Sequence, residues 1–326
     1  MHFRIQTALV FAVVSSAAAA APDDRLIYQS IVEQVRKGDG YYKAAAENLR
    51  ANNYPLKPAL AFRMPTLAVS EAALPSTLSR ALALWILTAA ALIAFSRSFA
   101  TRSALERLSL TALAMTGLAN VGAPGSIYLH EAWSVVFIVA AIAARRNTMA
   151  TAALLLCATL IRETAALALI AFAIDAALSR RWHRAVAFAG TLATFGCVWL
   201  AHAHLAASAV LPTDQVSPGW LAFGGLSMIV ATFNWNLLLA PLPIGIAAVV
   251  FAAAVWGSFL ARNDEALRPA VIYLGLFLLC LLVFGRPDNS YWGIMISPVV
   301  LLGLVNLVPG LRHTRHALSI GSKTPL

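Results

Sequence analysis

Long apolar runs recur along the 326-residue chain and are separated by short polar segments. The runs cover about residues 5–21, 80–96, 108–122, 185–207, 237–260, 270–285 and 293–308. An α-helix of about 20 apolar residues is needed to cross the ~30 Å hydrocarbon core of a bilayer. Within lipid each backbone polar group must be bonded inside its own helix. The pattern therefore predicts an all-α, polytopic transmembrane protein.

One long polar segment, residues 22–79, follows the first run. It contains two sets of apolar residues at helical spacing, namely Leu26, Ile27, Ile31 and Val35, then Tyr41, Ala45 and Leu49. Gly38-Asp39-Gly40 interrupts the spacing, and an extended stretch with two prolines follows at residues 53–58. We expect two amphipathic helices that lie along the membrane surface within an extracytoplasmic loop.

Two basic clusters, Arg145-Arg146 and residues 180–184, are separated by about 33 residues that contain only Arg162 and Glu163 as charges before residue 175. If both clusters lie on the cytoplasmic side, the chain crosses an even number of times between them. Two full spans do not fit, so two half-length helices that meet at Arg162-Glu163 are predicted. The alternative is one long buried helix with an internal ion pair.

Composition supports the membrane class, because 60% of the residues are hydrophobic and only 12% are charged, against about 25% charged in soluble domains. The formal charge of +10 comes mostly from short clusters between apolar runs. This is typical of the positive-inside rule rather than of nucleic-acid binding. The three cysteines lie inside apolar runs without ligand spacing, so no disulfide, zinc site or other cofactor is predicted.

The N-terminal run is compatible with a retained helix or with a cleaved signal peptide that ends in the alanines of residues 17–21. With a retained helix, the chain is a single membrane domain, residues 1–326, with about ten crossings, half-length helices included. Residues 220–236 are then interfacial or re-entrant. Both termini are cytoplasmic, the C-terminal one in a basic tail that includes Arg312 and Arg315.

This topology places the sparse polar groups on one side, the extracytoplasmic one. They are Asp23, Asp24, Asp39, Arg63, His130, Glu131, Arg162, Glu163, Arg286, Asp288, Asn289 and Tyr291. Ionisable residues at membrane depth are costly and therefore suggest function. A carboxylate can act as a general base, and arginine can hold a phosphate. Structural alternatives remain, since an aspartate also caps helices and Arg162-Glu163 also suits a structural pair.

The chain resembles the GT-C class of membrane glycosyltransferases, which use polyprenyl-phosphate sugars. The resemblance rests on an aspartate after the first run, the spacing from Asp24 to Tyr28, and the motifs Gly38 to Tyr42, Tyr54-Pro55, Arg63 to Leu67, Ile161 to Glu163 and Gly285 to Gly293. These motifs are most similar to a bacterial branch linked to cell-surface glycopolymer formation.

The resemblance implies an inverting sugar transfer in the bacterial inner membrane, with Asp24 as the catalytic base. Arg63, Arg162 and Arg286 are predicted to contact the phosphate, and His130, Glu131, Glu163, Asn289 and Tyr291 complete the predicted substrate site. The partners it implies are a polyprenyl-phosphate-linked sugar, a glycan or lipid acceptor, membrane lipid and envelope assembly proteins. Arg25 departs from the family pattern, because an acidic residue often stands there.

Two other functions are compatible with the same residues. Half-length helices that meet at charges also occur in transporters, so a transporter or flippase of lipid-linked sugar is one alternative. A non-catalytic subunit of a glycopolymer assembly complex is the other. The long polar loop and the lack of an evident inverted repeat favour the enzyme.

Overall fold

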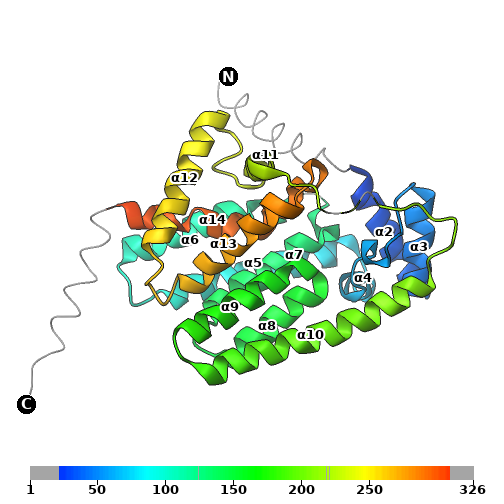
Figure 1. Cartoon of the computed structure of the whole chain (residues 1–326), viewed down its shortest axis with the longest axis horizontal. Helices are drawn as coiled ribbons and strands as arrows, with labels where there is room; N and C mark the ends of the chain where they lie inside the picture. Colours follow the sequence, from blue (N-terminus) through cyan, green and yellow to red (C-terminus); the bar gives the residue numbers. More distant parts are fainter. Residues whose placement is uncertain (1–21, 124, 218, 220, 309–326) are drawn as a thin grey trace, which may run out of the picture.

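The structure is a computed structural model that describes residues 22–308 except 124, 218 and 220 (Figure 1). The predicted helix at residues 5–21 and the basic C-terminal tail lie outside the described residues. Within them the chain is all-helical, with one isolated β-bridge between Lys57 and Val216. The all-α prediction is therefore confirmed for this part of the chain.

The elements follow one another with short connections. They are α2 (Pro22–Arg36), α3 (Tyr41–Ala51), η2 (Ala59–Ala61), α4 (Thr66–Ala72), α5 (Thr77–Ser98), α6 (Ala104–Leu118), η3 (Ala119–Gly122), η4 (Ser126–Tyr128), α7 (His130–Ala143), α8 (Thr148–Ile161), η5 (Glu163–Ala165), α9 (Ala166–Leu178), α10 (Trp182–Ser208), α11 (Gly225–Ala231), η6 (Thr232–Trp235), α12 (Ile244–Leu260), α13 (Arg268–Phe284), η7 (Pro287–Met295), α14 (Ser297–Val300) and η8 (Leu302–Leu307).

Helix α7 forms the centre of the bundle. It is buried along nearly its whole length and packs against α5, α8 and η7. Its apolar residues are continuous from Val135 to Ala143, and a helix that is apolar all round is stable only when other elements cover it on every side. Helix α9 packs on α8, α10 and α13.

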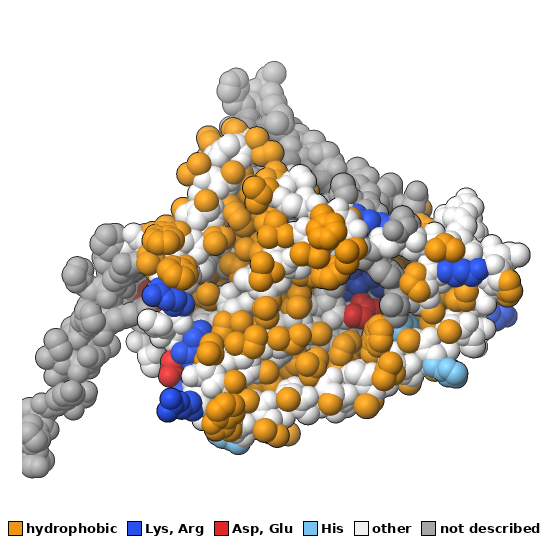
Figure 2. Space-filling model, viewed as in Figure 1, with side chains coloured by type: hydrophobic (Ala, Val, Ile, Leu, Met, Phe, Trp, Pro, Cys, Tyr) orange, Lys and Arg blue, Asp and Glu red, His pale blue; other side chains and the backbone are white. Residues whose placement is uncertain are grey.

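Helices α5 and α10 lie at the surface and are long and apolar enough to cross a membrane, with 22 and 27 residues. A bent pair near the end of the described chain, residues 289–307, is a third candidate if it forms one span. Large apolar side chains such as Ile86, Leu200 and Val249 are more than 60% exposed. Figure 2 shows hydrophobic side chains over most of the visible surface. Such a continuous apolar surface is compatible with a membrane protein, whereas the ten predicted crossings remain a prediction.

The two shorter helices predicted around Arg162-Glu163 are present as α8 and α9, of 14 and 13 residues. They bring the two basic clusters together at one end of the bundle, since the Arg184 guanidinium donates to the Arg145 carbonyl. The alternative of one continuous helix is therefore wrong. Figure 1 shows this end at the left, where α9 turns into α10.

The last apolar run is not one helix as predicted. It divides into η7, α14 and η8, with a bend of 58° between residues 289–295 and 297–307. Pro298 lies in the first turn of α14 and has no amide hydrogen for a continuous α-helical ladder. The span predicted at residues 237–260 is also shorter, because α12 begins only at Ile244.

Helices α2, α3 and α4 form a group at the opposite end, which we call the α2–α4 end (Figure 1). The two predicted amphipathic helices are confirmed as α2 and α3, separated by a turn in which Gly38 has φ 102°. The sequence did not predict α4, a helix of seven residues. The extended stretch pairs with a distant loop, since the Lys57 amide donates to the Gln215 carbonyl at 3.1 Å.

A fully buried arginine, Arg80, fastens this group to the bundle. Its guanidinium donates to the Glu33 carboxylate of α2 at 3.1 Å, to the Glu71 carbonyl of α4 at 3.0 Å and to the Tyr128 hydroxyl at 3.3 Å. Charge-assisted bonds of this kind are stronger than neutral ones. This one side chain of α5 thus bonds to both α2 and α4.

Glycines allow α12 and the end of the described chain to approach closely. A Cβ added at Gly257 of α12 would lie 2.0 Å from the Gly303 carbonyl oxygen, a contact that no side chain tolerates. Small residues at such positions let helix backbones pack in lipid. Gly245, on the same helix, has no atom within 4 Å of the equivalent point.

We expect Gly257→Ala to destabilise the protein by about 1–3 kcal/mol, because overpacking forces α12 and η8 apart. Gly245→Ala is the matched control, and it should be neutral or slightly stabilising because alanine favours the helix. Thermal unfolding in detergent, followed by circular dichroism, measures both. Equal losses for the two variants would show that α12 does not pack in this way.

Candidate functional site

Arg162 lies at the break between α8 and α9 in an extended conformation, with φ −140° and ψ 116°. Its side chain is only 3% exposed. The guanidinium Nε lies 2.5 Å from Glu131 Oε1 of α7, without the angle of a hydrogen bond, and Nη1 donates to Glu163 Oε2 at 2.8 Å. A buried charge needs such partners, because desolvation of a lone guanidinium is very costly. One arginine therefore ties the helix break to the central helix.

The guanidinium also lies over the Trp292 ring of η7, 5.5 Å from its centroid. Its remaining nitrogen, Nη2, is buried and makes no hydrogen bond to any described residue. The indole nitrogen of Trp292 is likewise buried and has no hydrogen-bond partner in the described part of the chain. Buried hydrogen-bond donors without an acceptor are rare in native proteins. The two nitrogens are therefore positioned to bind an acceptor atom of a ligand.

Arg63 approaches the same region from the segment between η2 and α4. Its carbonyl accepts a hydrogen bond from the Tyr41 hydroxyl at 2.7 Å, and its Nη2 donates to the Tyr291 hydroxyl at 3.0 Å. Within the described part of the chain, no carboxylate lies within 4.0 Å of the Arg63 guanidinium. The charges of Glu131 and Glu163 nevertheless act on it. Arg63 is thus a largely enclosed cation that has no direct ion pair within the described part of the chain.

Tyr28 and Asp24 face this cluster from α2. The Tyr28 ring packs edge-on against the His130 ring, with 5.0 Å between centroids. Asp24 lies one helical turn earlier, and residues four apart share a helix face. Burial raises the pKa of Tyr28 to about 12, with Arg63 opposing the shift and Asp24 adding to it. Tyr28 therefore keeps its proton near neutral pH and can donate a hydrogen bond.

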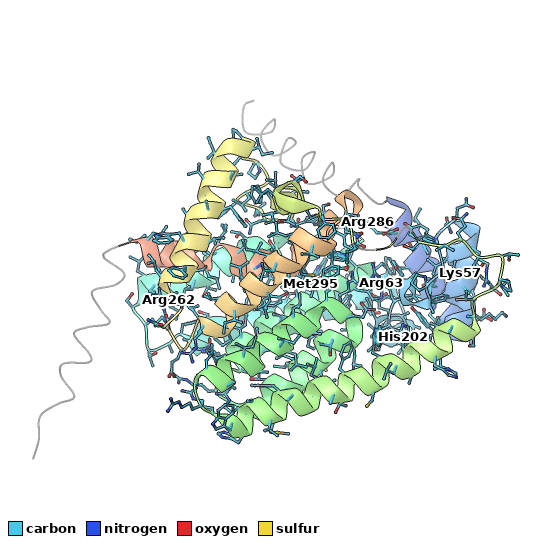
Figure 3. The ribbon with its side chains drawn as sticks, viewed as in Figure 1. Lys57, Arg63, His202, Arg262, Arg286 and Met295 are labelled. Carbon is cyan, nitrogen blue, oxygen red and sulfur yellow. The ribbon has the colours of Figure 1, made fainter. Side chains whose placement is uncertain are left out.

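The cluster lies in a recess of the apolar surface. In Figure 2 acidic and basic side chains are visible at the bottom of a hollow between hydrophobic ones, in the area where Figure 3 labels Arg63. His202 of α10 connects α3 with the segment that precedes Arg63. Its ring nitrogens lie 3.1 Å from the Tyr42 hydroxyl and 3.3 Å from the Phe62 carbonyl oxygen. The Arg63 segment is thereby fixed between α3 and α10.

The structure places the predicted site residues in two groups. The residues Arg63, His130, Glu131, Arg162, Glu163 and Tyr291 share one cluster, and Asp24 lies beside it on α2. Arg286 and Asn289 lie at the entry and start of η7, where Arg286 donates to the Gly219 carbonyl at 3.3 Å and Asn289 is buried. The side chains of Asp23 and Asp288 are outside the described residues, and Asp39 forms a local pair with Lys43.

Three aromatic residues of the cluster were not among the predicted site residues: Tyr28, Tyr41 and Trp292. Each lay in one of the quoted motifs, namely Asp24 to Tyr28, Gly38 to Tyr42 and Gly285 to Gly293, but aromatic residues near charges also fit membrane-interface belts. For metals, the described part of the chain contains no group of three or more His, Cys, Asp or Glu side chains arranged to hold an ion.

Comparison with known proteins gives no relative for this chain: no family model matches it, and no curated protein or solved structure is significantly similar.

We expect Glu131→Gln to lower the stability of the protein by about 3–5 kcal/mol, because it leaves the buried Arg162 charge with a single carboxylate. Glu163→Gln removes the other carboxylate and is the matched control. The Glu163 side chain is 23% exposed against 3% for Glu131, so water compensates part of its loss and the effect should be smaller. Chemical unfolding in mild detergent measures both variants. A larger loss for Glu163→Gln would contradict the arrangement.

Proposed function

We propose that this protein is a membrane glycosyltransferase that transfers a sugar from a polyprenyl-phosphate carrier to a glycan or lipid acceptor. One observation carries the proposal: Arg63 and Arg162, 99 positions apart in the chain, converge with tyrosines and carboxylates in a recess of an apolar helical bundle. A lipid phosphate needs cationic groups at the membrane boundary and an apolar surface for its chain. The sequence resemblance to GT-C transferases supports the same class.

The proposed topology places the α2–α4 end on the extracytoplasmic side of a bacterial inner membrane. The opposite end has most of the arginines, which include Arg145, Arg146, Arg181 and Arg184, as the positive-inside rule expects for the cytoplasmic side. About ten crossings, counted with half-length helices, complete this topology. It puts the recess within reach of carriers in the outer leaflet and of acceptors in the water phase.

In the proposed reaction, Arg63 and the free Nη2 of Arg162 hold the donor phosphate. Asp24 accepts the proton of the acceptor hydroxyl, and the acceptor oxygen forms a bond to the anomeric carbon as the bond from that carbon to the phosphate oxygen breaks. The polyprenyl phosphate leaves with the bonding electrons, and the arginines stabilise the added negative charge. Attack opposite the leaving group inverts the anomeric centre.

The neighbouring groups have supporting roles in this proposal. Tyr28 and Tyr291, both close to Arg63, donate hydrogen bonds to phosphate or sugar oxygens. His130 and Glu163 face the sugar, and Glu131 keeps Arg162 charged and oriented. Arg286 and Asn289, at the start of η7, are proposed to border the path by which substrate enters the recess. No metal is assigned a role.

Transfer of a labelled sugar by the purified protein in lipid tests this function. We expect Asp24→Asn to lower turnover by about 10²–10⁴-fold, the usual contribution of a general base, with donor binding nearly unchanged. Asp39→Asn is the matched control, because Asp39 lies in the same polar segment, residues 22–79, and its one ion pair among the described residues is with the exposed Lys43. It should keep wild-type turnover. Full activity of a folded Asp24→Asn protein would show that Asp24 is not the catalytic base.

The proposed contact between Arg63 and the donor phosphate is tested by the kinetics of an Arg63 variant. Arg63→Gln should raise the KM for the lipid-linked donor, because the variant loses a charge-assisted contact to the phosphate that is worth about tenfold or more in affinity. Movement of lipid-linked sugar across vesicles without any transfer product would instead favour the transporter function.

A further inference from the structure

A second polar cavity lies at the end of the bundle opposite the α2–α4 end. Its volume is about 110 Å³, well above the roughly 10–15 Å³ that one water needs on the same measure. Its walls come from the turn after α7, from α9, from the start of α10 and from the segment before α13. The lining residues are Arg145, Arg146, Phe172, Asp175, Arg181, Arg184, Glu265, Ala266 and Pro269. In Figure 2, basic and acidic side chains gather at this left end of the view.

The carboxylates of the lining already have arginine partners. Glu265 pairs with Arg181 at 2.7 Å, and Asp175 pairs with Arg268 at 2.5 Å. The other three arginines of the lining, Arg145, Arg146 and Arg184, have no carboxylate within 4.0 Å among the described residues. The cavity therefore has a surplus of positive charge.

Arg145 is the deepest of these groups and is only 7% exposed. Its guanidinium donates to neutral acceptors, the Ser98 hydroxyl at 2.8 Å and the Ser98 carbonyl at 2.9 Å. Burial, together with the charges of Arg146 and Arg102, lowers the pKa of Arg145 to about 10. A cation held in this way is stabilised by any anion that enters the cavity.

Arg184 lies beside Arg145 and is fixed in place by it. One Arg184 nitrogen donates to the Arg145 carbonyl, while its Nε is buried and makes no hydrogen bond among the described residues. The charges of Arg184 and Arg181 act on each other across the start of α10. A guanidinium with an unused donor beside a second arginine suits the several oxygens of a tetrahedral phosphate. The two carboxylates of the lining, Asp175 and Glu265, are engaged in ion pairs with Arg268 and Arg181, which favours a binding role for the cavity.

The surface beside the cavity is apolar. Leu178, Trp182 and Val186 follow one another at intervals of four residues along the turn from α9 into α10, and each is more than 60% exposed. Trp182 and Val186 share a face of α10. An acyl chain can lie on this surface while a phosphate group occupies the cavity.

We propose that this arginine-lined cavity binds a phosphate group, which comes from the headgroup of an anionic phospholipid or from free phosphate in solution. The site is separate from the Arg63 recess and does not depend on the glycosyltransferase function. It takes one phosphate at Arg184 and Arg181, and Phe172, Ala266 and Pro269 form the apolar part of the wall.

The full chain in nanodiscs tests the proposal with two probes. The first is inorganic phosphate, compared with chloride at equal ionic strength in phosphatidylcholine discs. The second is phosphatidylglycerol mixed into the same discs, with bound lipid counted by native mass spectrometry. A rise in the unfolding midpoint with inorganic phosphate identifies free phosphate as the ligand, and retention of phosphatidylglycerol over phosphatidylcholine identifies the headgroup. The absence of both effects in the wild-type protein overturns the proposal.

Arg184→Gln should weaken whichever probe binds by about tenfold or more, because it removes one charge-assisted contact to the phosphate. The matched control is Arg262→Gln, since Arg262 is exposed at the same end and donates only to the Phe259 carbonyl. It should bind as the wild type does. An equal loss of binding affinity in the two variants would show that the probe responds only to the general surface charge. That result would overturn the proposed site.

Glu265→Gln provides a test in the opposite direction that does not endanger folding, because the Glu265 side chain is 64% exposed. It releases Arg181 into the cavity, and binding of the same probe should become severalfold tighter. Unchanged or weaker binding of the probe to this variant would contradict the proposal that a phosphate group occupies the cavity.

Discussion

The burial of the Arg162 guanidinium is the constraint on which the centre of this structure depends. A charge that is 3% exposed inside an apolar bundle is stable only with opposite charges beside it, and Glu131 and Glu163 supply them. To meet Glu131 on α7, the chain must stop its helix at Ile161 and extend through Arg162. The break that forms α8 and α9 and the polar recess at their junction are therefore one feature.

The remaining parts of the recess are brought to Arg162 by contacts between distant segments. Arg80 attaches α2 and α4 to the bundle, Tyr41 and His202 fix the segment around Arg63, and Tyr291 meets the Arg63 side chain. Each contact holds a polar group before any ligand arrives. Groups oriented in advance cost no reorganisation when charge develops, which is the property that a site with a phosphate leaving group requires.

The sequence predicted the features that follow from charge placement and from local periodicity. The pair of short helices around Arg162 was predicted because the segment between the two basic clusters is too short for two full membrane spans. Helices α2 and α3 were predicted from the helical spacing of apolar residues on either side of Gly38. The bend before Pro298 and the helix α4 depend on packing against segments far along the chain, so hydropathy did not indicate them. Trp292 was missed for the same reason, since only its position over Arg162 distinguishes it from an interfacial tryptophan.

We propose that the Arg63–Arg162 recess holds the phosphate of a polyprenyl carrier, and an electron cryo-microscopy structure of the protein in nanodiscs with polyprenyl monophosphate would show where this phosphate lies. We expect density for the phosphate within hydrogen-bonding distance of Arg63 and of Arg162 Nη2, with the prenyl chain along the apolar surface of the bundle. Density for the carrier at another place, with the Arg63 guanidinium still bonded to the Tyr291 hydroxyl, would rule out this site.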